Sequence, residues 1–339
     1  MVRWAAVRIT ARGLGLAAAF AMTTGLAAGV TAGRLEVGTP ASAFHAGTRH
    51  SRSGRTAPPA TAAATPAPAP APATGTTTMM VSIRVGPMVR AYRLIRPVRP
   101  VAARIPALVM LHGVNATIDY EEQRDQLLPL AVTGQAVLAY PIGYEESWNA
   151  GVCCAPAAAD GVDDVGFITA VIHQLSADPM VDPSRITLMG YSNGGRMAYE
   201  VDCARPGIVP AVVVLMAVPV TPCDASTPVS LLEVANQGDP AVPYDSGTGG
   251  PDGLTAVGDV VTAWRKRDGC AYAATARSTT GLLTSEAWSD CQPGARVVLA
   301  TYAMQGHAWP GGDARTPSPG RLIWSFAVES TGLADPLPR

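Results

Sequence analysis

One short stretch of the chain combines a serine with closely spaced glycines. Residues 190–195 read "GYSNGG", which places Ser192 in a G-x-S-x-G pattern. A serine hydroxyl is a weak nucleophile until a neighbouring base removes its proton. That base in turn needs a carboxylate to hold its orientation. The pattern therefore predicts a nucleophilic serine only if a base and an acid follow it.

Both groups follow in the chain order expected for serine hydrolases with an α/β fold. His307 is the one histidine after Ser192, and it comes directly after the strand-like run "RVVLATYA". Asp239 follows the apolar run "VSLLEVAN" and is the best-placed acid, with Asp245 and Asp224 as competitors. The order of serine, acid and histidine predicts a Ser192–Asp239–His307 triad.

The predicted elements around these residues alternate between strands and helices. Apolar runs such as 106–112 and 185–190 are typical of strands that are covered on both faces. Helices are predicted over 119–131, 162–175 and 194–204. This alternation predicts an α/β-hydrolase fold, with a mostly parallel central sheet and helices on both faces, in a single catalytic domain. Ser192 then lies at a tight turn from a strand into a helix.

A triad of this kind needs backbone donors for the oxyanion that forms during acyl transfer. The N–H of Asn193, directly after the serine, is one predicted donor. The N–H of Val114 is the other, because it follows the predicted strand that ends at His112. We interpret His112 as a residue that shapes this loop and not as a second base.

The N-terminal region predicts export. Arg3, Arg8 and Arg12 precede a weakly apolar run over 14–30, as in a secretory signal peptide. Cleavage after Val30-Thr31-Ala32 gives a signal peptide over residues 1–32, and Ala41-Ser42-Ala43 is an alternative site. We therefore expect a secreted, extracellular protein with no stable membrane association after cleavage.

Composition divides the remaining chain into a linker and one domain. Residues 33–78 are rich in proline, alanine and threonine, which predicts a disordered linker. The catalytic domain is predicted over 79–336. The formal net charge of -1 gives no sign of the basic face that a nucleic-acid partner would need.

The cysteines predict disulfide bonds. An even number in an exported chain, six here, indicates paired thiols. Cys270 and Cys291 bracket a hairpin-like segment, so we expect them to pair with each other. Cys153 and Cys154 are expected to pair with Cys203 and Cys223, in an order that the sequence leaves open. No C-x-x-C and no histidine pair has zinc-ligand spacing, so no metal and no cofactor is expected.

Two further stretches carry residues that could line a substrate pocket. Trp148 and Asn149 follow a predicted strand end, where ligands bind in such sheets. Trp309 follows the proposed base by two positions. Aromatic walls would suit an aromatic ring or a sugar face of a substrate, although packing in the core would explain the tryptophans equally well. Asp163 and Asp164 are interpreted as residues that begin a helix.

The motifs taken together resemble a known family. "LHG", "WNAGVCC", "VDDVGFI", "GYSNGGRMAYE", "GDPAVPY" and "GHAWPGG" occur in this order between Pro106 and Phe326. The chain resembles the exported polyhydroxybutyrate depolymerase and feruloyl esterase family of α/β-hydrolases. The resemblance implies ester hydrolysis through an acyl-enzyme on the same triad, with a polyester oligomer or a plant cell-wall ester as substrate. The chain departs from the family in "VANQGD" before the acid and in "VNATIDYEEQ" after Gly113.

Three other functions fit parts of this pattern. A serine peptidase of the same fold uses the same serine motif, a mycolyl-type acyltransferase shares the fold and export, and a non-catalytic binding protein could keep the fold alone. An ester and amide substrate pair separates the peptidase from the esterase. A serine-directed probe separates a catalyst from a binding protein.

Overall fold

The computed structural model describes residues 75–151, 154, 156–221, 223, 225–245 and 254–329. By its contacts the chain divides into residues 1–67 and 68–339, and every described residue belongs to the second unit. The predicted signal peptide and nearly all of the predicted linker lie outside the described residues. The domain begins slightly before the expected start at Met79, since its first strand begins at Thr76.

The described elements are ten strands of one sheet and six helices. In chain order they are β1 (Thr76–Val85), β2 (Met88–Pro97), β3 (Ile105–Leu111), α1 (Ile118–Asp125), α2 (Leu128–Val132), β4 (Val137–Pro141), α3 (Asp164–Ala177), β5 (Val181–Tyr191), α4 (Asn193–Ala204), β6 (Ala211–Leu215), β7 (Ser230–Gly238), α5 (Val257–Arg267), β8 (Ala276–Thr280), β9 (Leu283–Trp288), β10 (Val297–Gln305) and α6 (Pro319–Glu329). None of these helices has the length and apolar character that a membrane span requires.

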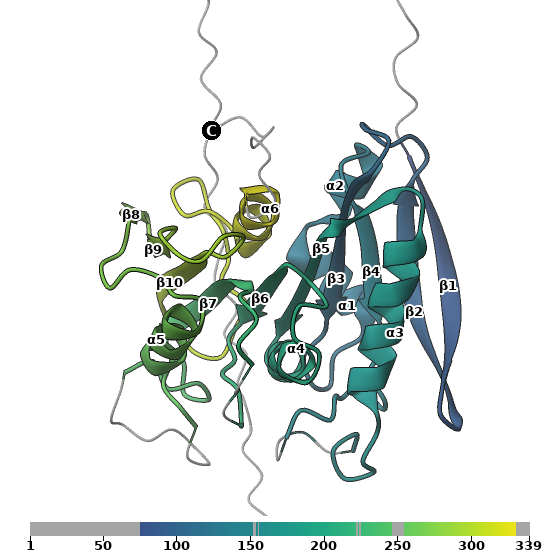
Figure 1. The fold of residues 1–339 in the computed structure, drawn as a ribbon, viewed down its shortest axis with the longest axis horizontal. Helices are drawn as coiled ribbons and strands as arrows, with labels where there is room; N and C mark the ends of the chain where they lie inside the picture. Colours follow the sequence, from purple (N-terminus) through teal and green to yellow (C-terminus); the bar gives the residue numbers. More distant parts are fainter. Residues whose placement is uncertain are drawn as a thin grey trace, which may run out of the picture. The chain divides into compact units, whose positions relative to one another are not determined.

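The sheet has a parallel centre and antiparallel edges (Figure 1). Its order is β1-β2-β4-β3-β5-β6-β7-β10-β9-β8. The six central strands, from β4 to β10, run parallel, whereas the β1–β2 and β8–β9 hairpins pair antiparallel at the two edges. The mostly parallel α/β sheet predicted from sequence is confirmed. The segment expected to be a hairpin insertion is a hairpin that continues the main sheet.

Helices cover both faces, which explains the continuous apolar strands. Alternate residues of β3 point into different cores: Val109 belongs to the core that includes residues of α3, α4 and α5, and Met110 to the core that includes residues of α2 and α6. Every residue of β3 is buried, as a strand between two helical layers requires. The helix expected over 119–131 is two helices, because the chain turns at Gln126 (φ 59°) and a new helix begins at Leu128, with Pro129 in its first turn.

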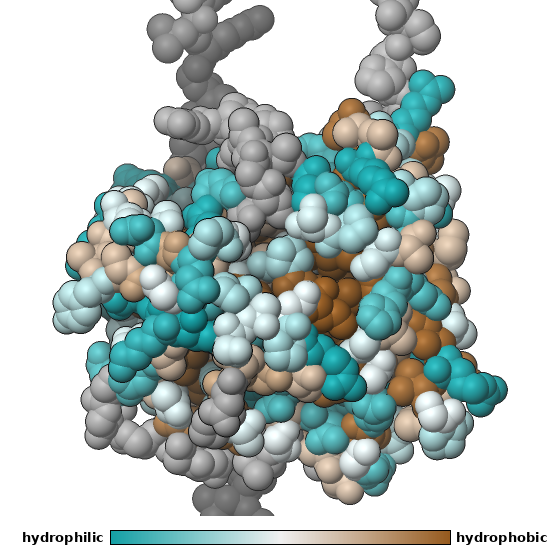
Figure 2. Space-filling view, viewed as in Figure 1, coloured by the Kyte–Doolittle hydropathy of each residue, from teal (hydrophilic) through white to brown (hydrophobic). Residues whose placement is uncertain are grey.

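The outer hairpin β1–β2 carries several exposed apolar side chains. Its large apolar side chains at Met79, Met80 and Val89 are 45 to 60 % exposed. Figure 2 shows hydrophobic colour among hydrophilic residues on the side where this hairpin lies, while the side of α5 is mainly hydrophilic. The catalytic-site candidates lie away from this hairpin, at the carboxyl ends of the central strands.

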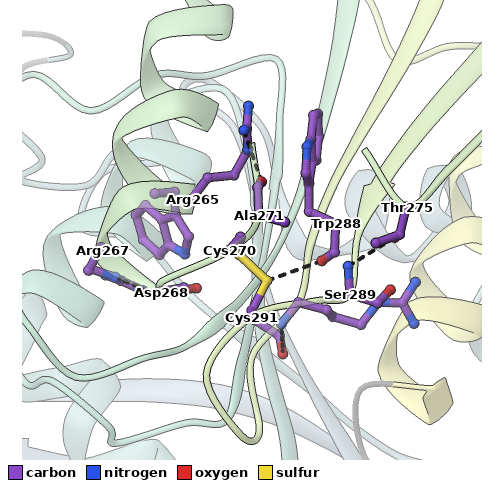
Figure 3. The surroundings of a disulfide bond; sticks show 12 residues. Arg265, Arg267, Asp268, Cys270, Ala271, Thr275, Trp288, Ser289 and Cys291 are labelled. Atoms are coloured by element: carbon purple, nitrogen blue, oxygen red, sulfur yellow. Dashed lines mark hydrogen bonds and ion pairs between the residues drawn. A yellow bond between two sulfur atoms is a disulfide. The ribbon is translucent and has the colours of Figure 1, made fainter. Parts of the chain in front are cut away.

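Two disulfide bonds join described residues. Cys270 pairs with Cys291, as expected, and connects the end of α5 to the segment between β9 and β10 (Figure 3). Cys203 pairs with Cys223, with a Cα–Cα distance of 5.5 Å. The expectation that these two cysteines bond to Cys153 and Cys154 is therefore wrong. The end of α4 and the chain after β6 lie side by side, a proximity that sequence spacing did not reveal. Cys153 lies outside the described residues.

A carboxyl group lies in the middle of the sheet. Glu233 of β7 is fully buried, and its carboxyl accepts a hydrogen bond from the Tyr199 hydroxyl of α4 at 2.5 Å. Burial raises the pKa of Glu233 well above its ordinary value, because the charged form loses its hydration. Burial also raises the pKa of Glu121 to about 7 and that of Asp268 to about 6. The folded protein therefore retains protons that the unfolded chain releases.

The Cys270–Cys291 bond should stabilise the domain, because it restricts the conformations open to the unfolded chain. Replacing both cysteines by serine should lower the free energy of unfolding by about 2–4 kcal/mol, as for a bond of this kind. Differential scanning calorimetry measures the loss as a lower Tm. The double serine variant of Cys203 and Cys223 is a matched control, because the sequence separations are 20 and 21. An unchanged Tm after removal of Cys270 and Cys291 would contradict the prediction.

Stability should fall as the pH rises above about 4.5, the ordinary value of a glutamate. The unfolded chain releases the Glu233 proton there, whereas the folded chain holds it to a higher pH, so each step upward favours unfolding. Glu233→Gln cannot ionise, and its curve of unfolding free energy against pH should be flatter than that of the parent. Glu286→Gln, at a carboxyl 28 % exposed in β9, is the control and should leave the slope unchanged. Equal slopes for parent and Glu233→Gln would refute the assignment.

Candidate active site

Ser192 lies between the last residue of β5 and the first residue of α4. Its backbone has φ 54° and ψ -119°, a conformation that non-glycine residues rarely adopt. The Ser192 N–H donates to the Leu215 carbonyl of β6 at 2.9 Å, and the Ser192 carbonyl accepts from the Arg196 N–H of α4 at 3.0 Å. The neighbouring strand and the helix therefore hold the serine in this strained conformation.

Two glycines of the motif allow backbones to approach closely. A Cβ atom on Gly194 would overlap the carbonyl oxygens of Leu111 and His112 at the end of β3. A Cβ atom on Gly190 would overlap the Gly194 carbonyl. The pattern around Ser192 thus reflects a steric requirement, since no larger residue fits where α4 passes β3 and β5.

The structure brings the three predicted triad residues together. The distance from His307 Nε2 to Ser192 Oγ is 2.8 Å, and the distance from His307 Nδ1 to Asp239 Oδ2 is also 2.8 Å. The second oxygen of Asp239 accepts from the N–H groups of Ala241 and Val242, at 2.8 and 3.2 Å. These bonds orient the carboxylate, so its free oxygen faces the imidazole. The competitor Asp245 is exposed on the same loop, and Asp224 lies outside the described residues.

Asn236 of the sheet, a residue that the sequence pattern did not indicate, holds the loop that carries His307. The side-chain amide of Asn236, at the end of β7, donates to the carbonyls of Gly306 and Ala308, both at 2.9 Å. Tyr191 also donates from its hydroxyl to the His307 carbonyl at 3.2 Å. Asn236 is part of the stretch "VANQGD" that departs from the resembled family, and this departure was the available signal.

The two expected oxyanion donors come from two segments next to Ser192. Asn193 is the first residue of α4, where N–H groups have no partner inside the helix. Val114 follows Gly113, and a Cβ atom built on Gly113 would lie 3.5 Å from Ser192 Cβ. The chain at Gly113 thus passes close to the Ser192 side chain, as the expectation for the second donor requires.

The expectation that Trp148 lines a substrate pocket is wrong. Its side chain is 0 % exposed, and its indole N–H donates to the His112 carbonyl at 2.8 Å. Asn149 is half-buried, and its amide donates to the Val162 carbonyl at 2.9 Å. Both residues are therefore committed to contacts within the protein. The sequence indicates the loop that carries Trp148 and Asn149, but not the direction of its side chains.

Trp309 is half-buried and belongs to an aromatic cluster next to the histidine. Its ring lies 5.7 Å from the ring of Tyr191, which in turn lies 5.6 Å from that of His307. The Arg124 guanidinium stacks over both Tyr191 and Trp309, at 3.9 and 4.8 Å from the ring centroids. Arg124 also pairs with the buried Glu121. This cluster packs α1 against the turn that carries the nucleophile.

Two buried charged or titratable groups support the loops around the site. His112 Nε2 accepts from the Gly143 N–H at 2.9 Å, so the ring carries its proton on Nδ1 and donates to the Gly113 carbonyl at 2.8 Å. Burial lowers the pKa of His112, which favours this neutral form.

Asp163 accepts from the Gly166 N–H at the start of α3, as expected, whereas Asp164 forms a buried ion pair with Arg90 at 2.7 Å.

One group of described residues has the spacing of metal ligands: Asp202, Cys203 and Cys223. The two cysteines are joined in a disulfide bond and so do not offer the thiolates that bind zinc. The group is therefore explained by the disulfide bond.

Comparison with known proteins gives relatives among esterases. No family model matches the chain. It is 29% identical over 227 residues to "Putative esterase NocK" of Nocardia uniformis subsp. tsuyamanensis, covering 61% of this chain and 66% of that protein. It is 26% identical over 239 residues to "Feruloyl esterase B" of Piromyces equi, covering 66% of this chain and 42% of that enzyme. The chain thus spans less than two thirds of either relative.

One solved structure supports the same fold. The acetyl xylan esterase from Aspergillus awamori superposes with a TM-score of 0.52 at 14% identity, over 74% of this chain and 98% of that one. The mostly parallel sheet, the strand-to-helix turn at Ser192 and the named relatives agree with one another. The chain therefore has the α/β-hydrolase fold and is similar to esterases, among them one of the feruloyl type.

Proposed function

We propose that this chain is an exported serine esterase that hydrolyses carboxylic ester bonds. The observation that carries the proposal is the line of contacts from Ser192 Oγ through the His307 imidazole to Asp239, at 2.8 Å for each step. This line begins at a strained turn that exposes a serine at the carboxyl edge of the sheet. The esterase names of the relatives support the same class of reaction.

The mechanism follows from which atoms face each other. His307 Nε2 takes the proton of Ser192 Oγ while that oxygen bonds to the carbonyl carbon of the ester. Asp239 holds the tautomer with the proton on Nδ1 and stabilises the imidazolium that forms. The carbonyl oxygen becomes an oxyanion, which the N–H groups of Asn193 and Val114 are expected to receive. The alcohol then leaves with the proton from His307, and an acyl-enzyme remains.

The second half of the cycle releases the acid. A water molecule gives a proton to His307 Nε2 and attacks the acyl carbon. The second tetrahedral intermediate collapses, the bond from the acyl carbon to Ser192 Oγ breaks, and the serine regains its proton from the imidazolium. The free carboxylic acid departs. None of these steps calls for a group beyond the triad, the backbone donors and water.

The substrate class remains one of two, both carboxylic esters: a feruloyl or acyl ester of a polysaccharide, or a polyhydroxybutyrate-type polyester. The relative named "Feruloyl esterase B" favours the first. A hydrolysis screen with p-nitrophenyl acetate, methyl ferulate and hydroxybutyrate oligomers decides between them. Export rests on the N-terminal segment over 1–32, and the disulfide bonds are typical of an oxidising compartment.

Loss of the nucleophile should abolish turnover. Ser192→Ala should lower kcat on p-nitrophenyl acetate by a factor on the order of 10⁴ or more, since triad residues act as a unit. His307→Ala should cost about as much, and Asp239→Asn less. A variant Ser192→Ala that keeps more than a tenth of the activity would exclude this mechanism. A parent that cleaves an amide and its ester analogue equally well would favour the peptidase.

Asn236 should matter to catalysis without touching the reacting atoms. Asn236→Ala removes both bonds to the His307 loop, so the imidazole is held less firmly and kcat should fall on the order of tenfold. Steady-state kinetics together with the Tm separates this effect from a loss of fold. Gln174→Ala serves as the control, because that α3 amide accepts from Tyr92 and does not contact the site. Equal kcat values for the Asn236 variant and the parent would contradict the role.

A further inference from the structure

The loop at residues 142–149 contacts both segments that carry an expected oxyanion donor, the start of α4 and the chain after β3. On one side it binds Asn193, the residue after the nucleophile. The Trp148 N–H donates to Asn193 Oδ1 at 2.7 Å, and Asn193 Nδ2 donates back to the Trp148 carbonyl at 3.1 Å. Two opposed bonds between one amide side chain and one residue's backbone fix the relative position of the two residues. Both are 1 % exposed or less, so water does not compete for these bonds.

On the other side the same loop holds the chain that leads to Val114. The Trp148 indole donates to the His112 carbonyl, which orients the peptide between His112 and Gly113. The His112 ring, held at Nε2 by the Gly143 N–H, donates to the Gly113 carbonyl. That carbonyl shares its peptide plane with the Val114 N–H, so a bond to the oxygen also sets the direction of the N–H.

The loop is in turn fixed to the sheet by a buried ion pair. Arg90 of β2 pairs with Asp164 at 2.7 Å, and both side chains are 5 % exposed or less. Arg90 also donates to the Ile142 carbonyl at 3.0 Å, at the first residue of the loop. Asp164 accepts from the Asn149 N–H at 2.8 Å, at its last residue. One ion pair therefore holds both ends of the loop.

The middle of the loop is strained. Glu145 and Glu146 are adjacent and have φ 43° and 55°, which is unfavourable for side chains of this kind. Ser147 closes the turn by donating its N–H to the Tyr144 carbonyl at 3.0 Å, and the Glu146 carbonyl accepts from the Asn115 N–H at 2.9 Å. Strain of this kind persists only where the surrounding contacts over-determine the conformation, and such positions cluster at functional sites.

We infer that Trp148 is a positioning residue, which sets the direction of both backbone donors, Asn193 and Val114, toward the developing oxyanion. The 142–149 loop and the Arg90–Asp164 pair hold Trp148 for that purpose. The inference rests on the proposed esterase function. The oxyanion carries its charge only in the transition state, so misplaced donors slow the chemical step while leaving the binding of the neutral ester unchanged.

The test removes one hydrogen bond and keeps an aromatic ring at the position, and the control loses the same side-chain volume. Trp148→Phe deletes the indole N–H that binds the His112 carbonyl. Trp264→Phe, in α5, is the matched control. Trp264 is also buried, at 5 % exposed, and its indole N–H donates to the Val229 carbonyl at 2.9 Å. We expect Trp148→Phe to lower kcat on p-nitrophenyl acetate by 10- to 100-fold with KM unchanged, since loss of a whole donor costs about 10²–10³. Trp264→Phe should keep kcat within twofold.

A second variant tests the inference if Trp148→Phe does not fold. Asn193→Ala keeps the backbone N–H of Asn193 but removes both bonds to Trp148, and it should lower kcat by a similar factor. Each variant is compared with the parent by Tm, so that a loss of folded protein is not counted as slower chemistry. Equal kcat for parent and variants, a rise in KM in place of a fall in kcat, or an equal loss in Trp264→Phe would overturn the inference.

A second readout separates this inference from the proposed function. A fluorophosphonate probe reacts with an activated serine and places charge on a phosphoryl oxygen in the same position, whatever the natural substrate. Slower labelling of Ser192 in Trp148→Phe, with normal labelling in Trp264→Phe, supports the inference even if the parent hydrolyses no ester. Labelling at equal rates in all three proteins overturns it, and a parent that is not labelled overturns both proposals.

Discussion

The close approach of three backbones around Ser192 is the constraint on which the site depends. The end of β3, the turn after β5 and the start of α4 meet where a single added Cβ atom at Gly194 would overlap two carbonyl oxygens. This crowding forces the serine into a left-handed conformation and leaves its hydroxyl at the sheet edge. Because the strands and the helix are each buried in a large core, the strain costs little relative to the packing that maintains it.

The rest of the site is built by polar groups that are bound in the interior. Asn236 holds the loop that carries His307, Asp239 is oriented by backbone N–H groups, and the Arg90–Asp164 pair holds the 142–149 loop. Each of these groups is buried and hydrogen-bonded, so its position is defined by several bonds at once. A hydroxyl on a strained turn is in this way aligned with an imidazole on a distant loop.

Burial also separates the roles of the two histidines near the site. His112 is enclosed, its pKa is lowered by burial, and both of its nitrogens are bound to backbone groups of neighbouring loops. His307 keeps a side chain 26 % exposed and faces the serine and the aspartate. The same side chain is therefore a fixed support in one place and a contact of the serine hydroxyl in the other.

The pattern of residues was enough to predict the α/β fold, the turn at Ser192 and the proximity of His307 and Asp239 to that serine. These rest on local signals: apolar runs of strand length, glycines at a fixed spacing and the order of groups along the chain. Only the folded chain showed three further features. They are the pairing of Cys203 with Cys223, the inward direction of Trp148 and the hydrogen bonds from Asn236 to the His307 loop. Each depends on which segments lie beside each other across the sheet, and sequence distance carries no record of that.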